Sequence, residues 1–259
     1  MPPTYQAVGR RRLPEEIVDQ IETLIVNSEL RVGDPLPPER ELARQLQVSR
    51  NVLREAIGML AQKGLVQVRP GAGTFVAQPT AAFIADTLHL HLRLNPGLLL
   101  DFIEARIGLE TETAGMAAVR AADCHIEALK KTLDDMDAFR GDPDRYVEAD
   151  ADFHIELARA TGNQVLVLLI TSLRAALREN VRYFVSKPEV VEKSLRYHHE
   201  IYDAVAAHQT DAARVAMRGH FAHIVDGLRS GVLVDRSVAQ RTSSPPEERQ
   251  HVVNAVAHR

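Results

Sequence analysis

One aspartate and three histidines are spaced in a way that could hold a metal ion. Asp150 and His154 lie four residues apart, so a helix there places both side chains on one face. His198 and His220 fall on two later predicted helices. One carboxylate with three imidazoles suits zinc, nickel or manganese far better than calcium, because nitrogen donors favour these metals. The sequence has 11 histidines, however, and an Asp–His pair at this spacing is more often an ordinary surface pair, so spacing alone leaves both interpretations open.

A second group of side chains, rich in arginine, could contact DNA. Arg50 and Arg54 lie four residues apart near the start of a predicted helix, and Arg40 lies near the start of the preceding one. In the major groove, arginine can pair with O6 and N7 of guanine, and side chains of the preceding helix commonly meet phosphate. Arg50 and Arg54 could equally be solvated on a helix face, paired with Glu55 or Glu41.

The elements that would position these arginines follow from periodicity and capping. Apolar spacing predicts a helix over residues 13–28. The glycine and three prolines of residues 31–38 make a second helix start near residue 38 and run to about 46, and a third is expected over 49–63. Ser49 is placed to cap the third helix, and Gly64 ends it. Two short strands are predicted next, over residues 65–68 and 74–76. Gly71 and Gly73 permit the tight turn between the strands, so the segment is predicted to be a winged helix-turn-helix.

The remainder of the chain changes to a purely helical pattern. From residue 81 to about 230 we expect six or seven helices joined by short breaks, one of them a long helix that starts near Gln164. The predicted fold class is mainly α, with three helices and a small β-hairpin followed by an all-α six- to seven-helix bundle. The predicted domains are 10–77 for the winged helix-turn-helix, 81–231 for the helical domain and 235–259 for a polar, disordered tail.

Composition limits the class of protein. A chain of 259 residues with 45% hydrophobic content can form two domains, each with its own core. Its apolar runs are far shorter than the roughly 20 residues of a membrane span, so no membrane partner is expected. The first residues lack the apolar stretch of a secretory signal, which predicts a cytoplasmic location. Cys124 is the single cysteine and can form neither an internal disulfide nor a thiolate metal cluster.

Charge is distributed unevenly along the chain. The net charge of −4 at first argues against nucleic acid, because phosphate binding depends on Lys and Arg. Residues 1–79, however, carry ten Lys or Arg against nine Asp or Glu, which gives +1 and leaves −5 for the remainder. The asymmetry is weak, so the inference of DNA binding depends on where the arginines fall.

Four segments of the N-terminal domain resemble the signature of the GntR family of bacterial transcription regulators. They are Leu36–Ala43, Val48–Ala56, Gly64–Leu65 and Gly71–Val76. By position, the resemblance implies that DNA is contacted by Arg40, Ser49, Arg50, Asn51 and Arg54, helped by the wing glycines Gly71 and Gly73. Gln47 departs from the pattern, since the family usually has a glycine in this turn, and it must tolerate that backbone conformation.

The helical domain resembles the FCD ligand-binding domain of the FadR subfamily. The similar segments are Phe102–Glu110, Asp150–Asn163, His198–Ile201 and Met217–Phe221. By position, the resemblance implies a divalent transition metal, zinc with nickel or manganese as alternatives, bound by Asp150, His154, His198 and His220. A register error of one residue or one turn would replace a ligand by His199 or His223.

The resemblance also implies a small effector, a carboxylate or a sugar acid that completes the coordination of the metal. Arg106 is available for a carboxylate, although it could equally pair with Glu110 on its own helix. Arg174 and Arg178 could line the cavity from the long helix, or they could belong to a solvated face.

The function that fits both halves is a repressor that responds to a metabolite. We expect a homodimer, because a palindromic operator in double-stranded DNA requires a two-fold protein. An alternative is a metal-dependent hydrolase, but the zincin motif H-E-x-x-H is not present: Asp203 stands where its second histidine would follow His199 and Glu200. A metal-free dimerisation module or a fatty acyl binder is a third possibility, against which the three histidines argue. The sequence therefore favours a regulator over an enzyme.

Overall fold

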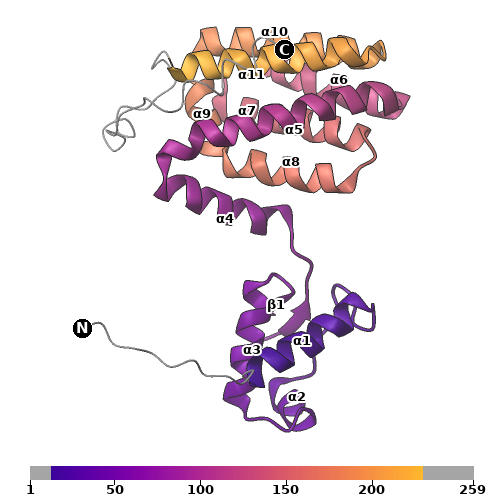
Figure 1. The fold of residues 1–259 in the computed structure, drawn as a ribbon, viewed down its shortest axis with the longest axis vertical. Helices are drawn as coiled ribbons and strands as arrows, with labels where there is room; N and C mark the ends of the chain where they lie inside the picture. Colours follow the sequence, from indigo (N-terminus) through magenta and orange to yellow (C-terminus); the bar gives the residue numbers. More distant parts are fainter. Residues whose placement is uncertain (1–12, 230–259) are drawn as a thin grey trace, which may run out of the picture. The chain divides into compact units, whose positions relative to one another are not determined.

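The computed structural model describes residues 13–229, which are coloured in Figure 1. The chain divides into two compact units, Met1–Phe83 and Ile84–Arg259, here called the N-terminal and C-terminal units. The predicted domain limits at residues 10 and 231 and the predicted tail over 235–259 lie outside the described residues.

The N-terminal unit contains the three helices and the hairpin that the sequence predicts. The helices are α1 (Leu13–Val26), α2 (Glu39–Gln45) and α3 (Arg50–Gln62). The strands are β1 (Val66–Arg69) and β2 (Gly73–Val76), which pair in antiparallel register with Val66 opposite Val76. The backbone before α2 extends this sheet, because Leu36 N–H donates to the carbonyl of Thr74 at 2.8 Å. The unit is thus a winged helix-turn-helix.

One face of α3 forms the centre of this unit's core. Leu53, Ala56 and Leu60 are fully buried at helical spacing and belong to the same core as Ile17 and Ile21 of α1. Because the apolar residues occupy one side of α3, the polar residues of its first two turns lie exposed on the other side.

The turn between α2 and α3 depends on an uncommon backbone conformation. Gln47 has a φ of +54°, in the left-handed region where glycine is favoured. The expectation that Gln47 must tolerate the conformation of the family's usual glycine is therefore met. At the end of α3, Gly64 adopts a φ of +71° and ends the helix as predicted.

From Ala81 onward, the regular secondary structure of the described chain is all helical. Its helices are α4 (Ala81–Leu94), the 3₁₀ turn η1 (Pro96–Leu98), α5 (Leu99–Arg120), α6 (Asp123–Ala138), α7 (Pro143–Ala160), α8 (Gln164–Ala176), α9 (Arg178–Val185), α10 (Pro188–Ala206) and α11 (Thr210–Arg229). The mainly α fold is as predicted, with eight α-helices up to residue 229 where six or seven were expected. The long helix expected from Gln164 is divided at Leu177 into α8 and α9. Over residues 13–229, no helix combines the length and apolar character needed to cross a lipid bilayer.

In the C-terminal unit, α5 packs against α7, α10 and α11, and α10 and α11 lie next to each other in Figure 1. Small residues on α5 allow this close packing: Ala114, Ala117 and Ala118 are fully buried. Larger side chains fill the rest of the core, among them Met136, Phe153, Leu157, Met217 and Phe221. Within this apolar surrounding, a small group of charged and polar side chains is also buried, and it contains the predicted metal ligands.

Candidate functional site

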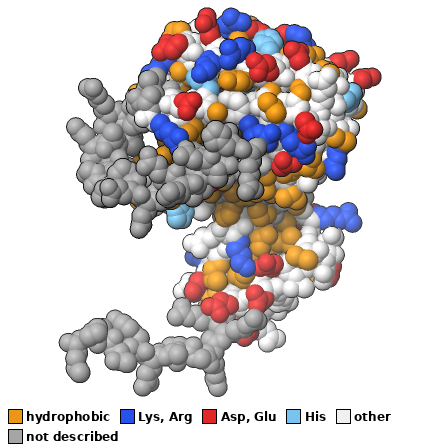
Figure 2. Space-filling model, turned by 45° about the horizontal axis from the view of Figure 1, so that its top comes forward, with side chains coloured by type: hydrophobic (Ala, Val, Ile, Leu, Met, Phe, Trp, Pro, Cys, Tyr) orange, Lys and Arg blue, Asp and Glu red, His pale blue; other side chains and the backbone are white. Residues whose placement is uncertain are grey.

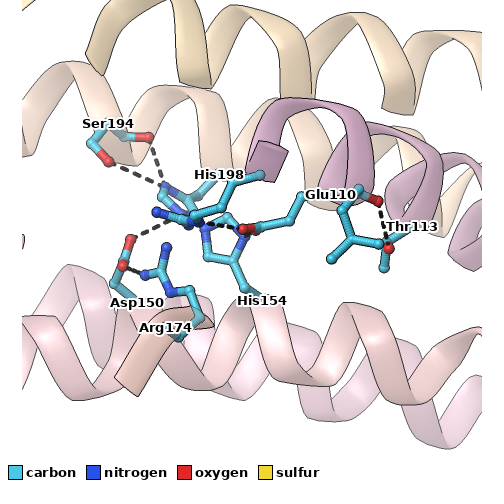
Figure 3. Close-up of polar contacts among 9 residues, drawn as sticks. Glu110, Thr113, Asp150, His154, Arg174, Ser194 and His198 are labelled. Carbon is cyan, nitrogen blue, oxygen red and sulfur yellow. Dashed lines mark hydrogen bonds and ion pairs between the residues drawn. The ribbon is translucent and has the colours of Figure 1, made fainter. Parts of the chain in front are cut away.

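The three predicted histidine ligands meet inside the C-terminal unit, and Figure 3 shows two of them, His154 and His198. His154 of α7, His198 of α10 and His220 of α11 are buried, and one ring nitrogen of each lies within 4.8 Å of the others. Asp150, one turn before His154, joins them, because its Oδ1 lies 3.2 Å from Nε2 of His198. Side chains from three helices, separated by up to 70 residues, thus converge on one point.

The ring orientations leave lone pairs directed at one another. Nδ1 of His198 donates to the backbone carbonyl of Ser194 at 2.8 Å, and Nδ1 of His154 lies 2.6 Å from Oε2 of Glu110. These acceptors hold the protons on Nδ1, so both Nε2 atoms carry lone pairs. The two Nε2 atoms are only 3.3 Å apart. In a tetrahedral site with metal–nitrogen bonds of about 2.0–2.1 Å, two imidazole nitrogens lie roughly this far apart.

His220 completes the argument that the donor set fits a metal. Both of its ring nitrogens are buried, and neither has a hydrogen-bond partner in the part of the chain that the structure describes. A buried polar atom without a partner is costly, and a metal ion would supply the partner. One carboxylate and three imidazoles therefore fit a divalent transition metal.

The electrostatic surroundings keep these ligands in the protonation states that metal binding requires. Burial, reinforced by neighbouring imidazoles and cations, lowers the pKa values of His198 and His220 well below the usual range for histidine, which favours the neutral rings. Burial acts to raise the pKa of Glu110, but the Arg106 guanidinium, His154 and Arg174 outweigh it and hold that pKa far below its usual range. Glu110 is therefore a buried carboxylate that can orient the His154 ring.

A cavity lies next to the histidines. Its charged and polar lining includes Arg106, Asp150, Arg174, Asn180, Ser194 and His220. Apolar side chains such as Phe184, Val185 and Val190 line the rest. The cavity volume of about 30 Å³ leaves room for only two or three water molecules, since one needs roughly 10–15 Å³. A metabolite therefore requires side chains of the lining to rearrange.

Arg106 pairs with Glu110 and also lines the cavity. Its Nε donates to Oε1 of Glu110 at 2.6 Å, as the pairing on one helix predicted. Its Nη2 is buried without a hydrogen-bond partner in the described chain, and the residue lines the cavity. One side of the guanidinium thus remains available for an anionic ligand.

Arg178 is not where the sequence-based prediction put it. Its side chain is 65% exposed, forms an ion pair with Glu148 and does not line the cavity. The reason is the division of the long helix at Leu177, after which Arg178 starts α9. Arg174, one turn earlier on α8, lines the cavity instead, and its Nη2 forms an ion pair with Oδ2 of Asp150.

The two neighbouring histidines do not take part in the cluster. Nε2 of His199 lies 3.0 Å from Oδ2 of Asp137, and the His199 side chain is 43% exposed. His223 lines the cavity but is not among the three converging histidines. The structure therefore places His198 and His220, rather than these neighbours, at the point of convergence.

The predicted DNA-contacting residues all lie exposed in the N-terminal unit: Arg40, Ser49, Arg50, Asn51, Arg54, Gly71 and Gly73. Nε of Arg54 donates to Oε2 of Glu39 at 2.7 Å, so its partner is neither Glu55 nor Glu41. Arg40 and Arg50 form no ion pair with any residue between 13 and 229. Ser49 caps α3 as predicted, because its Oγ accepts from Val52 N–H at 3.3 Å, and its own hydroxyl proton remains free to be donated.

The wing is shaped by its glycines and supported by an aromatic contact. Gly71 and Gly73 have φ values of +74° and +113°, which other residues adopt only with strain. The Arg69 guanidinium lies over the Phe75 ring, 4.6 Å from its centroid, and so joins the two strands. The tip of the wing therefore has a defined backbone with no side chain at either glycine.

The surface of the C-terminal unit offers no comparable basic site on the face that Figure 2 shows. Acidic and basic side chains are interspersed there. Such a mixed distribution of charge gives no strong field of one sign on this face.

Three residues of the site have roles that sequence reasoning missed. The Glu110 carboxylate contacts Nδ1 of His154, and the Ser194 carbonyl accepts from Nδ1 of His198. Arg174 forms an ion pair with Asp150. Ser194 lies four residues before His198, a helical spacing that was visible in the sequence. The other two contacts join different helices, and only the packing of the bundle reveals them.

Two family models match the chain. The model described as bacterial regulatory proteins, gntR family, matches residues 13–76, and the FCD domain model matches residues 101–223. These segments contain the exposed arginines of α2 and α3 and the converging histidines, respectively.

Individual proteins are similar over most of their length. The HTH-type transcriptional regulator LutR of Bacillus subtilis is 31% identical over 210 residues, which is 79% of this chain and 96% of LutR. The HTH-type transcriptional repressor NanR of an Enterobacter species is 32% identical over 219 residues, covering 82% of this chain and 84% of NanR. Among solved structures, Streptococcus agalactiae GntR is 30% identical with a TM-score of 0.66, covering 82% of this chain and 98% of that one.

Proposed function

Since the chain belongs to the GntR family of bacterial regulatory proteins, with an FCD domain after its winged helix-turn-helix, we propose that it is a repressor controlled by a metal-bound metabolite. Its relatives LutR and NanR are transcription regulators, and this chain is likewise a transcription regulator and not an enzyme. The observation that carries the proposal is the pair of facing Nε2 atoms of His154 and His198, 3.3 Å apart.

The metal would be held by Asp150, His154, His198 and His220. Zinc is the first candidate, and nickel or manganese would also accept this donor set. When bound, such an ion supplies a Lewis acid with positions open to the oxygens of a ligand. Glu110 and Ser194 orient two of the histidine rings for this purpose.

The effector would be a small carboxylate or a sugar acid. The buried charges of the cluster balance before a metal is added, because Arg106 and Arg174 face Glu110 and Asp150. A divalent cation adds two positive charges in a place where unpaired charge is costly. An anionic ligand restores the balance, and the unpartnered Nη2 of Arg106 is placed to bind its carboxylate.

The DNA partner would be a palindromic operator bound by a homodimer. The start of α3 would enter the major groove with Arg50, Asn51 and Arg54, while Ser49 and Arg40 contact the backbone and the Gly71–Gly73 wing lies alongside. The effector would alter operator affinity by binding one arrangement of the two DNA-binding units more tightly than another. Such a regulator acts at the chromosome, in the cytoplasm.

Metal analysis of the purified full chain tests the proposal. Wild type, His198→Ala and the adjacent control His199→Ala are dialysed against Zn²⁺ and then against buffer, and bound metal is counted per chain. We expect about one ion for wild type and His199→Ala and far less for His198→Ala. Loss of metal in the control alone, or metal-free wild type, would rule out this ligand set.

A further inference from the structure

The cavity beside the histidines is lined by an ion pair that includes one of the proposed metal ligands. Arg174 and Asp150 are joined through Nη2 and Oδ2, and their side chains are only 3% and 6% exposed. The other carboxylate oxygen of Asp150 lies 3.2 Å from Nε2 of His198. One carboxylate oxygen of Asp150 therefore contacts a buried guanidinium, and the other contacts the histidine cluster (Figure 3).

Arg174 occupies a place where its positive charge is costly. Its side chain is buried, and a second guanidinium, that of Arg106, lines the same cavity. A buried charge is stable only with a partner of opposite charge, and Asp150 is that partner for Arg174. The guanidinium neutralises Asp150 as a metal ion would.

We propose that the Arg174 guanidinium and the metal ion are alternative partners of the Asp150 carboxylate, so that metal binding moves Arg174 away from Asp150. The inference rests on the proposed metal site. A divalent ion at the three histidines would lie within a few ångströms of Asp150, and a guanidinium at the same carboxylate would be repelled strongly in this buried surrounding. The Arg174 guanidinium thus competes with the metal ion for the Asp150 carboxylate.

The exchange has a consequence for the effector. Arg174 and Arg106 both line the cavity, so an arginine released from Asp150 is available to an anion there, beside the unpartnered Nη2 of Arg106. Metal binding therefore creates the site for the acid, and each ligand raises the affinity of the other, as thermodynamic linkage requires. The metal-free protein should bind such an acid weakly.

Affinity for Zn²⁺ alone tests the exchange. The full-length protein competes for Zn²⁺ with a chromophoric chelator. Four forms are compared: wild type, Arg174→Met, Arg174→Lys and the control Arg178→Met. Arg178 is a suitable control because it is exposed and pairs with Glu148. We expect Arg174→Met to bind Zn²⁺ at least about tenfold more tightly than wild type, because no cation competes for Asp150. Arg174→Lys and Arg178→Met should stay within a few-fold of wild type. Equal or weaker binding by folded Arg174→Met would overturn the inference, since Arg174 would then only position Asp150.

A second measurement covers the case in which Arg174→Met does not fold without metal. Crystal structures of wild type with and without Zn²⁺ should show the Arg174–Asp150 contact only in the metal-free form. The same contact in both forms would overturn the inference while the metal site stands. If wild type binds no Zn²⁺, the proposed function and the inference fail together, so the two failures can be distinguished.

Discussion

The Nε2 atoms of His154 and His198 face each other at 3.3 Å between fully buried rings. Each ring has its other nitrogen at an acceptor, the Glu110 carboxylate for His154 and the Ser194 carbonyl for His198. The two facing atoms therefore both carry lone pairs, which repel unless a cation lies between them. The helices α7 and α10 thus hold these side chains in an arrangement suited to a metal ion.

Replacement of Glu110 by glutamine should weaken metal binding. The amide loses the charge that fixes the proton on Nδ1 of His154, and loss of such an outer partner typically costs about 10–100-fold in metal affinity. Competition with a chelator measures the effect. The control is Glu112→Gln on the same helix, where the exposed carboxylate pairs with Arg214. Unchanged affinity in Glu110→Gln would show that His154 does not depend on this carboxylate.

The metal-free protein should lose stability as pH falls below about 6.5. The pKa values of His198 and His220 are lowered in the folded chain, first of all by burial, whereas the unfolded chain protonates its histidines near pH 6.5. Below that pH the unfolded state binds more protons, and each histidine reduces the free energy of unfolding by about 1.4 kcal/mol per pH unit until its folded-state pKa is reached.

Urea unfolding in the presence of a chelator, repeated across pH 5 to 7.5, measures this slope. The variant His198→Asn with His220→Asn should show a shallower dependence, because it lacks both titrating rings. Identical slopes for this variant and wild type would mean that the two histidines are not buried as neutral rings.

Gln47→Gly should stabilise the N-terminal unit by up to about 1 kcal/mol. Gln47 adopts a φ of +54°, where a side chain causes strain and glycine does not. The matched control is Gln45→Gly within α2, which should cost about 0.5–1 kcal/mol because its backbone is helical. Urea unfolding of the full chain compares the two. A loss of stability in Gln47→Gly would show that the Gln47 side chain contributes more than its backbone costs.

Local signals explain which parts of the fold were predictable. Ser49, Gly64 and the apolar spacing of α3 fixed the helix-turn-helix, because capping and periodicity act over a few residues. The break at Leu177 was missed, since no glycine or proline marks residues 174–180. The sequence offered both Arg174 and Arg178 for the cavity, and only Arg174 lines it.

The site itself was predictable only in part. Asp150 and His154 show helical spacing, but the choice of His198 over His199 followed from the resemblance to a family and not from the residues. The contacts of Glu110 with His154 and of Arg174 with Asp150 join residues of different helices. Their formation depends on how α5, α7 and α8 pack, which no local pattern encodes.

The most direct test of the regulator proposed here is its binding to DNA from upstream of its own gene. Fluorescence anisotropy at one stated salt concentration compares wild type with Arg50→Ala, Arg54→Ala and the control Arg44→Ala, whose arginine pairs with Glu41 on α2. We predict specific binding by wild type and the control, and a loss of about 1–3 kcal/mol in each of the other two variants. Wild-type affinity in Arg50→Ala and Arg54→Ala would contradict the assignment of α3 as the recognition helix, and with it the proposed mode of operator binding.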